Sequence, residues 1–347
     1  MPAPRHGIAD FVTAQWQRRG WFAWLMWPLS LLFGLIARTR RIAYQRGWFK
    51  STRLPMPVIV VGNVTVGGTG KTPIVSWLYD HLASRGWQPA ILSRGYGGSM
   101  TGPVWVDGTI HDASMCGDEP LMMAESRDVL VSRDRVTGAR AIAAQGSYDV
   151  IIMDDGLQNP HLQKQVRIGV FDGGFGVGNG WLIPAGPLRT SWRTGMGMMD
   201  MAIINGTDSA GVAAQIAGRL PVHHVKTQID QEVVESLQGT PLLAFAGIGR
   251  PARMFDSLKE AGAQIAKTLS FADHHPYSAH DLTRIQEDAH HHGAAMITTH
   301  KDWIRLPAEW RERVTLLPVS ILPEDSDALL DSVEARLRQP QDRGRHD

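Results

Sequence analysis

A glycine-rich run that ends in lysine and threonine carries the clearest chemical signal in the sequence. It follows the apolar residues 58–61 and reads Gly67, Gly68, Thr69, Gly70, Lys71, Thr72. Glycines let successive backbone N–H groups turn toward phosphate oxygens, and the start of a following helix adds a positive dipole. The lysine of such a loop reaches the β- and γ-phosphates, and the hydroxyl binds Mg²⁺. The run predicts a phosphate-binding loop for ATP and Mg²⁺, with Thr65 standing where the common pattern has its first glycine.

Two adjacent acids end another apolar run, as a metal site beside a phosphate loop requires. Residues 148–153 lead directly into Asp154, Asp155 and Gly156. Adjacent side chains at a strand end point to opposite sides, so only one of these acids would face the phosphates. We expect Asp155 to bind Mg²⁺ together with Thr72, with Asp154 as the alternative.

An α/β sheet would position these groups. Apolar runs at 58–61, 89–93, 148–153 and 166–171 predict buried strands, and residues 73–84 predict a helix after the glycine-rich loop. The strand 89–93 runs into Arg94 and several glycines, which places a cation at the edge where open α/β sheets bind ligands. Residues 179–189, apolar but interrupted by Gly and Pro, predict an ordered loop or lid.

The second half repeats the alternation on a smaller scale. Residues 241–246, 265–269 and 294–298 read as strands, and 253–261 and 281–291 as helices, whereas residues 225–239 have no clear period. The predicted fold is α/β: a P-loop NTPase-like parallel sheet flanked by helices, a smaller C-terminal α/β subdomain and an N-terminal hydrophobic helix. We expect domains at 1–50, 51–230 and 231–347.

Other reactive side chains are fewer. His274, within Asp273-His274-His275, is a natural proton acceptor, although this triplet also fits a metal site or a surface loop. Acids at 118 and 119 precede Pro120 and fit the start of a helix. His290 to His292 fit a helix end and are assigned no metal. Cys116 is the only cysteine, which excludes an intrachain disulfide, and it reads as a small buried residue.

Charge is distributed unevenly along the 347 residues. The total of +1 argues against a nucleic-acid coat protein, and 43% apolar with 20% charged residues excludes a disordered chain. Residues 1–57 carry nine Lys or Arg and one acid, a net charge of +8, and the rest sums to −7. The basic segment therefore needs its own explanation.

That segment contains eighteen uncharged residues, Gly20 to Ala37, with arginines on both sides. As a helix it would be about 27 Å long, close to the roughly 30 Å of a bilayer core, and Pro28 would kink it. Trp21, Trp24 and Trp27 lie near one helical face and suit the headgroup region of a membrane. We predict an N-terminal anchor on an anionic membrane, either spanning or interfacial, over the alternative of a buried core helix.

Taken together, the motifs resemble the tetraacyldisaccharide 4′-kinase family of lipid A biosynthesis. The matching segments follow one another in order: GGTGKTP at 67–73, SRGYGG at 93–98, GDEP at 117–120, DDGLQ at 154–158, the stretch 179–189 and FADHH at 271–275. The resemblance implies transfer of the γ-phosphoryl group of ATP to the 4′-hydroxyl of a tetraacyldisaccharide 1-phosphate. It also implies a location at the cytoplasmic face of a Gram-negative inner membrane. From the charge balance we expect no nucleic-acid partner, and the sequence shows no sign of an obligate protein partner.

The resemblance also implies roles for individual residues. His274 would take the proton of the sugar hydroxyl, and Asp118 would orient it. Lys71 would hold the γ-phosphate, and Thr72 and Asp155 the Mg²⁺, with Asp154 and Gln158 close by. The residues implied to face the substrate or lid are Arg94, Asn179 and Arg189. Two positions depart from the family: Thr190 replaces an acid, and His300 replaces a glutamate, so the roles of those acids are not carried over.

Three other functions fit part of the sequence. A membrane-targeted switch ATPase of the partitioning type uses a related loop, but it usually has a lysine where this chain has Val66. A metal-dependent phosphoesterase built on residues 273–275 would leave the phosphate loop unexplained. The third possibility is a nucleotide-binding scaffold without catalysis.

Overall fold

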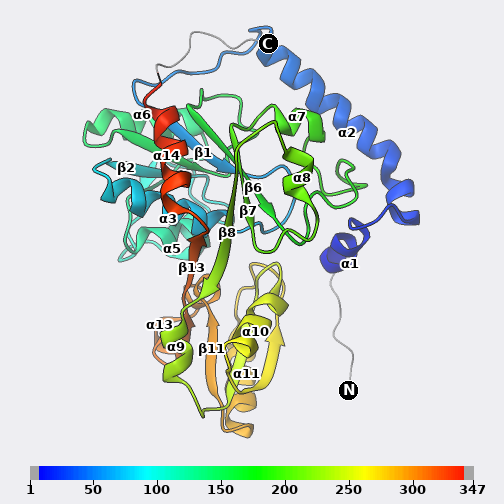
Figure 1. The fold of residues 1–347 in the computed structure, drawn as a ribbon. Helices are drawn as coiled ribbons and strands as arrows, with labels where there is room; N and C mark the ends of the chain where they lie inside the picture. Colours follow the sequence, from blue (N-terminus) through cyan, green and yellow to red (C-terminus); the bar gives the residue numbers. More distant parts are fainter. Residues whose placement is uncertain (1–7, 340–347) are drawn as a thin grey trace. The chain divides into compact units, whose positions relative to one another are not determined.

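The computed structural model describes residues 8–339, which form two compact units (Figure 1). The first unit contains the described residues of Met1–Arg94, Asp134–Lys226 and Pro323–Asp347, and the second contains Gly95–Arg133 and Thr227–Leu322. Each unit is therefore built from separate stretches of the chain. The predicted domains 1–50, 51–230 and 231–347 are contiguous, because a linear pattern cannot reveal that 95–133 packs with 227–322 or that the C-terminal helix returns to the first unit.

A parallel sheet forms the centre of the first unit. Its strands lie side by side in the order β8 (Val222–Ile229), β7 (Met201–Asn205), β6 (Val166–Asp172), β1 (Val58–Gly62), β5 (Val150–Asp154), β2 (Pro89–Ser93). Every residue of β1, β2, β5 and β7 is buried. This explains why these strands read as continuous apolar runs, since both faces of a parallel sheet are covered.

Helices cover this sheet. α3, α6 and α14 contact it directly, and α14 also contacts α3. The helices of the unit are α1 (Ile8–Gln15), α2 (Trp21–Gln45), α3 (Lys71–Ser84), α6 (Arg135–Gln145), α7 (Trp192–Met196), α8 (Val212–Ile216) and α14 (Ser326–Leu337). Because β1, β2 and β5 are parallel, their carboxyl ends bring the glycine-rich loop, Asp154 and Arg94 to one edge.

The second unit has its own four-stranded parallel sheet. The strand order is β10 (Ile265–Ser270), β9 (Leu242–Ala246), β11 (Ala295–Thr299), β12 (Val314–Leu317). Alternate residues of β9 pack in different clusters: Leu242 and Ala244 join Phe255 of α10, whereas Leu243 and Phe245 join Ile285 of α11. Helices therefore cover both faces of this sheet.

The remaining elements complete the second unit. They are β3 (Val104–Trp105), α4 (Ala113–Cys116), α5 (Asp118–Ala124), β4 (Val129–Val131), α9 (Gln231–Ser236), α10 (Pro251–Glu260), α11 (Ala279–His291), α12 (His300–Trp303) and α13 (Ala308–Arg311), with β13 (Val319–Pro323) leading back to the first unit. His290 and His291 lie in the last turn of α11, and Cys116 is buried, as predicted.

The fold prediction is confirmed, and the strands and helices that it specified after residue 57 have ends shifted by no more than a few residues. Residues 225–239, which have no clear period in the sequence, contain most of β8 and the whole of α9. The predicted helix 20–37 is too short. α2 continues through the arginines to Gln45, since a long basic side chain disrupts only the apolar pattern and not helical geometry.

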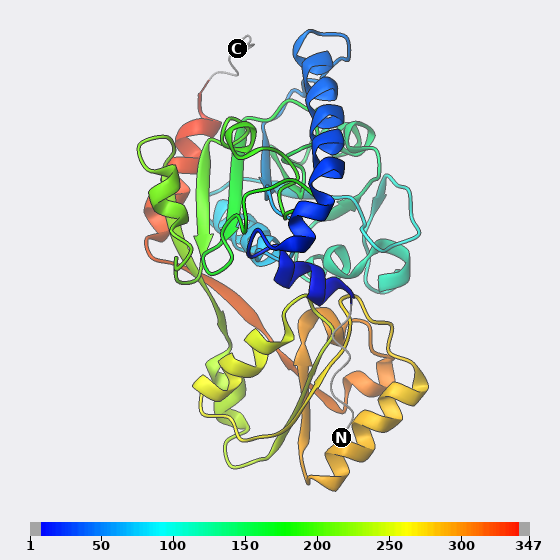
Figure 2. The same cartoon turned by 90° about the vertical axis from the view of Figure 1, so that its right-hand side faces the viewer.

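Helix α2 lies along the first unit (Figure 2). It carries an exposed apolar surface. Ser30 attaches it to the 179–189 loop: its hydroxyl donates to the carbonyl of Leu182 at 2.7 Å and accepts from the N–H of Ala185 at 3.0 Å. Many of its large apolar side chains face solvent: Trp21, Trp24, Leu25, Trp27, Leu29, Leu31, Leu32, Leu35, Ile36. Among the described residues, α2 supplies the one helix that is long and apolar enough to cross a membrane.

Candidate active site

The glycine-rich run forms a loop between β1 and the first residue of α3, which is Lys71. Gly67 and Gly70 have φ angles of +113° and +82°, values that favour glycine. The side-chain amide of Asn63 donates to the carbonyl of Gly67 at 3.2 Å, which ties the two ends of the turn together. Thr72 is buried in the first turn of the helix. The predicted strand, loop and helix of a phosphate-binding loop are all present.

Residues 187–189 brace this loop. The N–H of Val66 donates to the carbonyl of Pro187 at 2.8 Å, and the N–H of Arg189 donates to the carbonyl of Val64 at 2.8 Å. Gln158 adds a contact from its side-chain amide to the carbonyl of Asn63 at 2.6 Å. The 179–189 segment is thus an ordered loop, as predicted, and it is joined to the phosphate loop by backbone hydrogen bonds.

Asp155 lies at the same edge, one residue beyond β5. Nη1 of Arg189 is 3.2 Å from its Oδ1 and 3.1 Å from its Oδ2. Burial raises the pKa of this carboxyl, but the cations of Lys71, Arg189 and Arg135 outweigh that effect and lower the pKa below its usual value. Asp155 is thus held ionised beside the phosphate loop, whereas Asp154 is buried at the end of β5.

Further cations surround this acid. Arg135 is buried, and its Nη2 donates to the carbonyl of Asp154 at 3.1 Å. Burial, together with the nearby cation of Arg94, lowers the pKa of Arg135 to about 10, so it remains charged at neutral pH. Arg94 itself is exposed after β2. The edge therefore offers the positive charge that a polyphosphate needs.

Asn179 forms hydrogen bonds within its own loop. Its Nδ2 donates to the carbonyl of Ala185 at 2.9 Å, its Oδ1 accepts from the N–H of Trp181 at 3.0 Å, and its backbone N–H donates to Trp16. The side chain is buried and shapes the loop itself. These contacts favour a structural role, and direct contact of Asn179 with a substrate stays a prediction.

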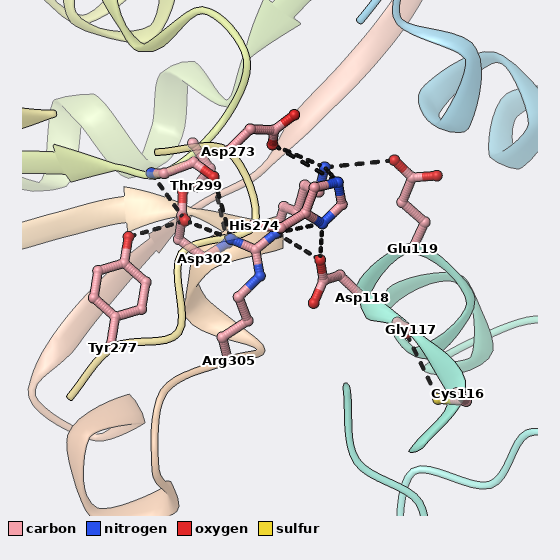
Figure 3. Close-up of polar contacts among 12 residues, drawn as sticks. Cys116, Gly117, Asp118, Glu119, Asp273, His274, Tyr277, Thr299, Asp302 and Arg305 are labelled. Carbon is pink, nitrogen blue, oxygen red and sulfur yellow. Dashed lines mark hydrogen bonds and ion pairs between the residues drawn. The ribbon is translucent and has the colours of Figure 1, made fainter. Parts of the chain in front are cut away.

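The second unit joins Asp118 to His274 (Figure 3). Oδ2 of Asp118 lies 2.6 Å from Nδ1 of His274 and 2.6 Å from Nη2 of Arg305. Burial raises the pKa of Asp118, but the hydrogen bonds from His274 and Arg305 bring it down to about 2. Asp118 is therefore an acceptor only, and it holds the imidazole with Nδ1 protonated and Nε2 directed away from the carboxylate.

The buried carboxylate of Asp302 holds Arg305 in place beside Asp118. Asp302 is fully buried, and its Oδ1 accepts from the N–H of Gly247 at 3.0 Å, the hydroxyl of Tyr277 at 2.9 Å and Nη1 of Arg305 at 3.1 Å (Figure 3). The hydroxyl of Thr299 donates to the other oxygen at 2.6 Å. The sequence did not predict a role for Asp302, Arg305 or Tyr277. None of them lies in a recognisable motif, and in the sequence they resemble ordinary surface residues.

Backbone strain marks both predicted clusters. Among the described residues, Asp155 and His274 are the two non-glycine residues with positive φ, at 46° and 60°. Such a conformation costs about 1–3 kcal/mol and persists where the surrounding contacts over-determine it, most often at functional sites. Its occurrence at one residue of each cluster supports a functional role for both.

The first unit is thus a P-loop α/β fold with an acid and several cations at its ligand-binding edge, which is the class of nucleotide-dependent phosphotransferases and ATPases. A family model described as tetraacyldisaccharide-1-P 4′-kinase matches residues 22–338. A tetraacyldisaccharide 4′-kinase of Methylobacterium nodulans is 46% identical over 316 residues, 90% of each chain. One from Bradyrhizobium sp. BTAi1 is 43% identical over 341 residues, 94% of this chain and 97% of that relative.

A solved structure gives the same result. The crystal structure of an "apo" form of LpxK from Aquifex aeolicus in complex with ATP is 26% identical, with a TM-score of 0.74, and covers 91% of this chain and 99% of that one. The chain belongs to the tetraacyldisaccharide-1-P 4′-kinase family, and its activity is that of a 4′-kinase in lipid A biosynthesis. The family and fold predicted from the sequence are confirmed, and the three competing functions are set aside.

Proposed function

We propose that the two clusters divide the kinase reaction between them, the first unit binding ATP and the second activating the acceptor hydroxyl. The observation that carries this proposal is the 2.6 Å contact between Asp118 and His274. A phosphate loop by itself would not distinguish a kinase from an ATPase, which transfers the phosphoryl group to water. The acceptor is the 4′-hydroxyl of a tetraacyldisaccharide 1-phosphate.

In this mechanism ATP lies on the glycine-rich loop. Backbone N–H groups of residues 67–70 surround the phosphates, and Lys71 contacts the γ-phosphoryl group. The solved Aquifex aeolicus relative was crystallised with ATP, which supports the same nucleotide here. Arg94 and Arg189 add positive charge at this edge, where charge develops on the transferred group.

Mg²⁺ fits the oxygen donors of the first unit. Mg²⁺ prefers one or two carboxylates together with substrate phosphates and water, and Thr72 with Asp155 provides a hydroxyl and an ionised carboxylate. When bound, the ion would neutralise charge on the β- and γ-phosphates. Asp155 would hold it once Arg189, now paired with that carboxylate, turns to the phosphates.

His274 acts as the general base. The hydroxyl O–H bond breaks and its proton passes to Nε2 of His274, while the hydroxyl oxygen forms a bond to the γ-phosphorus. The bond from that phosphorus to the bridging oxygen breaks, and ADP leaves with the electron pair. Asp118 keeps Nδ1 protonated and stabilises the imidazolium that results.

Membrane association belongs to this function. The acceptor carries four acyl chains, and α2 exposes a long apolar surface next to basic residues on both flanks. With 25 residues, α2 is about 37 Å long at roughly 1.5 Å per residue, enough to cross a bilayer core. We propose that α2 holds the enzyme at the inner membrane, with the kinase units on the cytoplasmic side, where ATP is available.

A radiolabel transfer assay tests the proposal. The purified full-length chain is incubated with γ-labelled ATP, Mg²⁺ and a defined tetraacyldisaccharide 1-phosphate in detergent micelles. We expect label in the lipid, with a loss of about 10²- to 10⁴-fold in kcat for His274→Ala. A folded His274→Ala enzyme with the wild-type kcat would contradict the assignment of the base.

A further inference from the structure

Lys301 lies against the nitrogen of His274 that the proposed mechanism uses. Its Nζ is 3.2 Å from Nε2 of His274, 3.3 Å from Oδ1 of Asp273 and 3.6 Å from Oε1 of Glu119. All four residues belong to the second unit. Since an ammonium group has three hydrogens and no acceptor, these three atoms match its bonding capacity.

The hydrogen-bond pattern defines the state of the imidazole. Nδ1 of His274 lies 2.6 Å from Oδ2 of Asp118, an ionised carboxylate that can only accept, so Nδ1 carries a hydrogen. Nη2 of Arg305 is also 3.4 Å from Nδ1, but its shorter contact, at 2.6 Å, is with the same carboxylate oxygen. Lys301 is a donor, so the atom that it faces, Nε2, carries a lone pair. The two contacts together select the neutral tautomer that a general base needs.

The backbone of Lys301 is fixed by the same buried network that holds Arg305. Lys301 follows the first residue of α12, where Thr299 caps the helix by accepting from the N–H of Asp302 at 3.2 Å. The side chain of Asp302 in turn binds Gly247, Tyr277 and Arg305. The ammonium group, in contrast, is at the end of a flexible side chain that is 19% exposed.

We propose that Lys301 is a positioning residue that acts through His274: it holds Nε2 unprotonated and aimed at the place of the acceptor hydroxyl, and yields this place when the hydroxyl arrives. Asp273 and Glu119 then retain the ammonium group, so that its displacement leaves no unpaired charge. The inference rests on the role of His274 as the base. It adds a residue to which no role was assigned from the sequence.

A double-mutant cycle tests the inference in the full-length enzyme. We expect Lys301→Met to lower kcat about 10- to 100-fold with an unchanged KM for ATP, because a misplaced base costs rate and not nucleotide affinity. Lys301→Arg should recover part of this loss, since it keeps the charge and the donors. In the His274→Ala background, Lys301→Met should have no further effect on kcat.

The outcomes separate this inference from the proposed function. Equal kcat losses for Lys301→Met in the wild-type and His274→Ala backgrounds would show that Lys301 does not act through His274. Wild-type kcat in Lys301→Met would overturn the inference and leave His274 as the base. If His274 is not the base, His274→Ala alone will show the wild-type kcat, whatever the result for Lys301→Met.

Two further measurements guard against a purely structural effect. The ¹⁵N resonances of His274 report which ring nitrogen carries the proton, and we expect Lys301→Met to move them toward a mixture of tautomers; unchanged resonances would contradict the inference. Lys267→Met, which removes the 2.5 Å ion pair with Asp288 in the same unit, serves as the matched control and should retain kcat.

Discussion

Oδ2 of Asp118 lies 2.6 Å from Nδ1 of His274, although 156 positions separate the two residues in the sequence. The short contact joins the first residue of α5 to the loop that follows β10. It gives the second unit a carboxylate–imidazole pair whose other ring nitrogen, Nε2 of His274, can accept a proton. Several measurable consequences arise from this pair and from the loop in the first unit.

Replacing the carboxylate by an amide should disable the base. Asp118→Asn presents an N–H₂ or a carbonyl to Nδ1 and no longer selects one tautomer, so we expect kcat to fall about 10²- to 10⁴-fold with the KM for ATP unchanged. Steady-state kinetics of lipid phosphorylation measures this. Asp230→Asn, which exchanges one good N-cap of α9 for another, is the control and should retain activity.

The carboxylate of Asp118 should make the free energy of unfolding depend on pH in the acidic range. The pKa of Asp118 is about 2 in the folded protein, below the 3.8 of an ordinary aspartate, so its stabilising effect is fully present above about pH 4 and is lost as the pH falls toward 2. The shift corresponds to about 2 kcal/mol. Urea unfolding of wild type and Asp118→Asn should give a difference in free energy that shrinks across this range; a constant difference would argue against the assignment.

Lys71 should be needed for turnover and not for folding. It lies at the start of α3 and is half-buried, so Lys71→Ala should leave the thermal midpoint within a few degrees while kcat falls by at least about 10²-fold.

Asp155→Asn tests the metal site of the first unit, because asparagine tolerates the positive φ of this position and removes only the charge. Because a metal ligand is lost, Asp155→Asn should raise the Mg²⁺ concentration at which activity is half-maximal, as measured by Mg²⁺ titration of lipid phosphorylation.

Two neighbouring glycines should differ in their tolerance of a methyl group. An added Cβ meets open space at both Gly67 and Gly68, but only Gly67 has a positive φ, +113°. Gly67→Ala should therefore destabilise the protein by about 1–2 kcal/mol, and Gly68→Ala by much less. Denaturant unfolding without nucleotide compares them, and equal losses would contradict the backbone explanation.

The exposed surface of α2 should control membrane binding. Leu35 of α2 is 60% exposed. Leu322 of strand β13 is 52% exposed and serves as the control. Leu35→Asp should lower partitioning onto anionic liposomes with little change in stability, and Leu322→Asp should not. Flotation assays measure this partitioning. If both variants partitioned like the wild type, α2 would not be the membrane-binding element.

Much of the fold followed from local pattern. The strands β1, β2 and β5 are buried on both faces, so each appeared as an apolar run bounded by polar residues, and the glycine-rich loop was defined by its own sequence. β8 did not read as a strand, because only Val225 and Ile229 of its eight residues are buried. Its polar, half-exposed residues carry no clear period.

The candidate site was predictable only where motifs marked it. Asp118 and His274 came from the family resemblance, and no spacing rule could pair residues so far apart. Arg305 and Lys301 were missed, since a cation on a short helix or in the turn after it looks like any surface residue until the fold brings a carboxylate or an imidazole to it. Asn179 was placed correctly in its loop, but its amide is committed to the loop's own backbone.

Because both units are assembled from distant stretches, the order of synthesis on the ribosome limits when each can form. Asp118 is translated long before the loop that supplies His274, and α3 packs against α14, which comes last. A nascent chain that stops before residue 323 lacks α14, so its phosphate-loop helix α3 can pack only against the sheet, although every residue of that loop has been made. Activity should therefore require that the chain extend through α14.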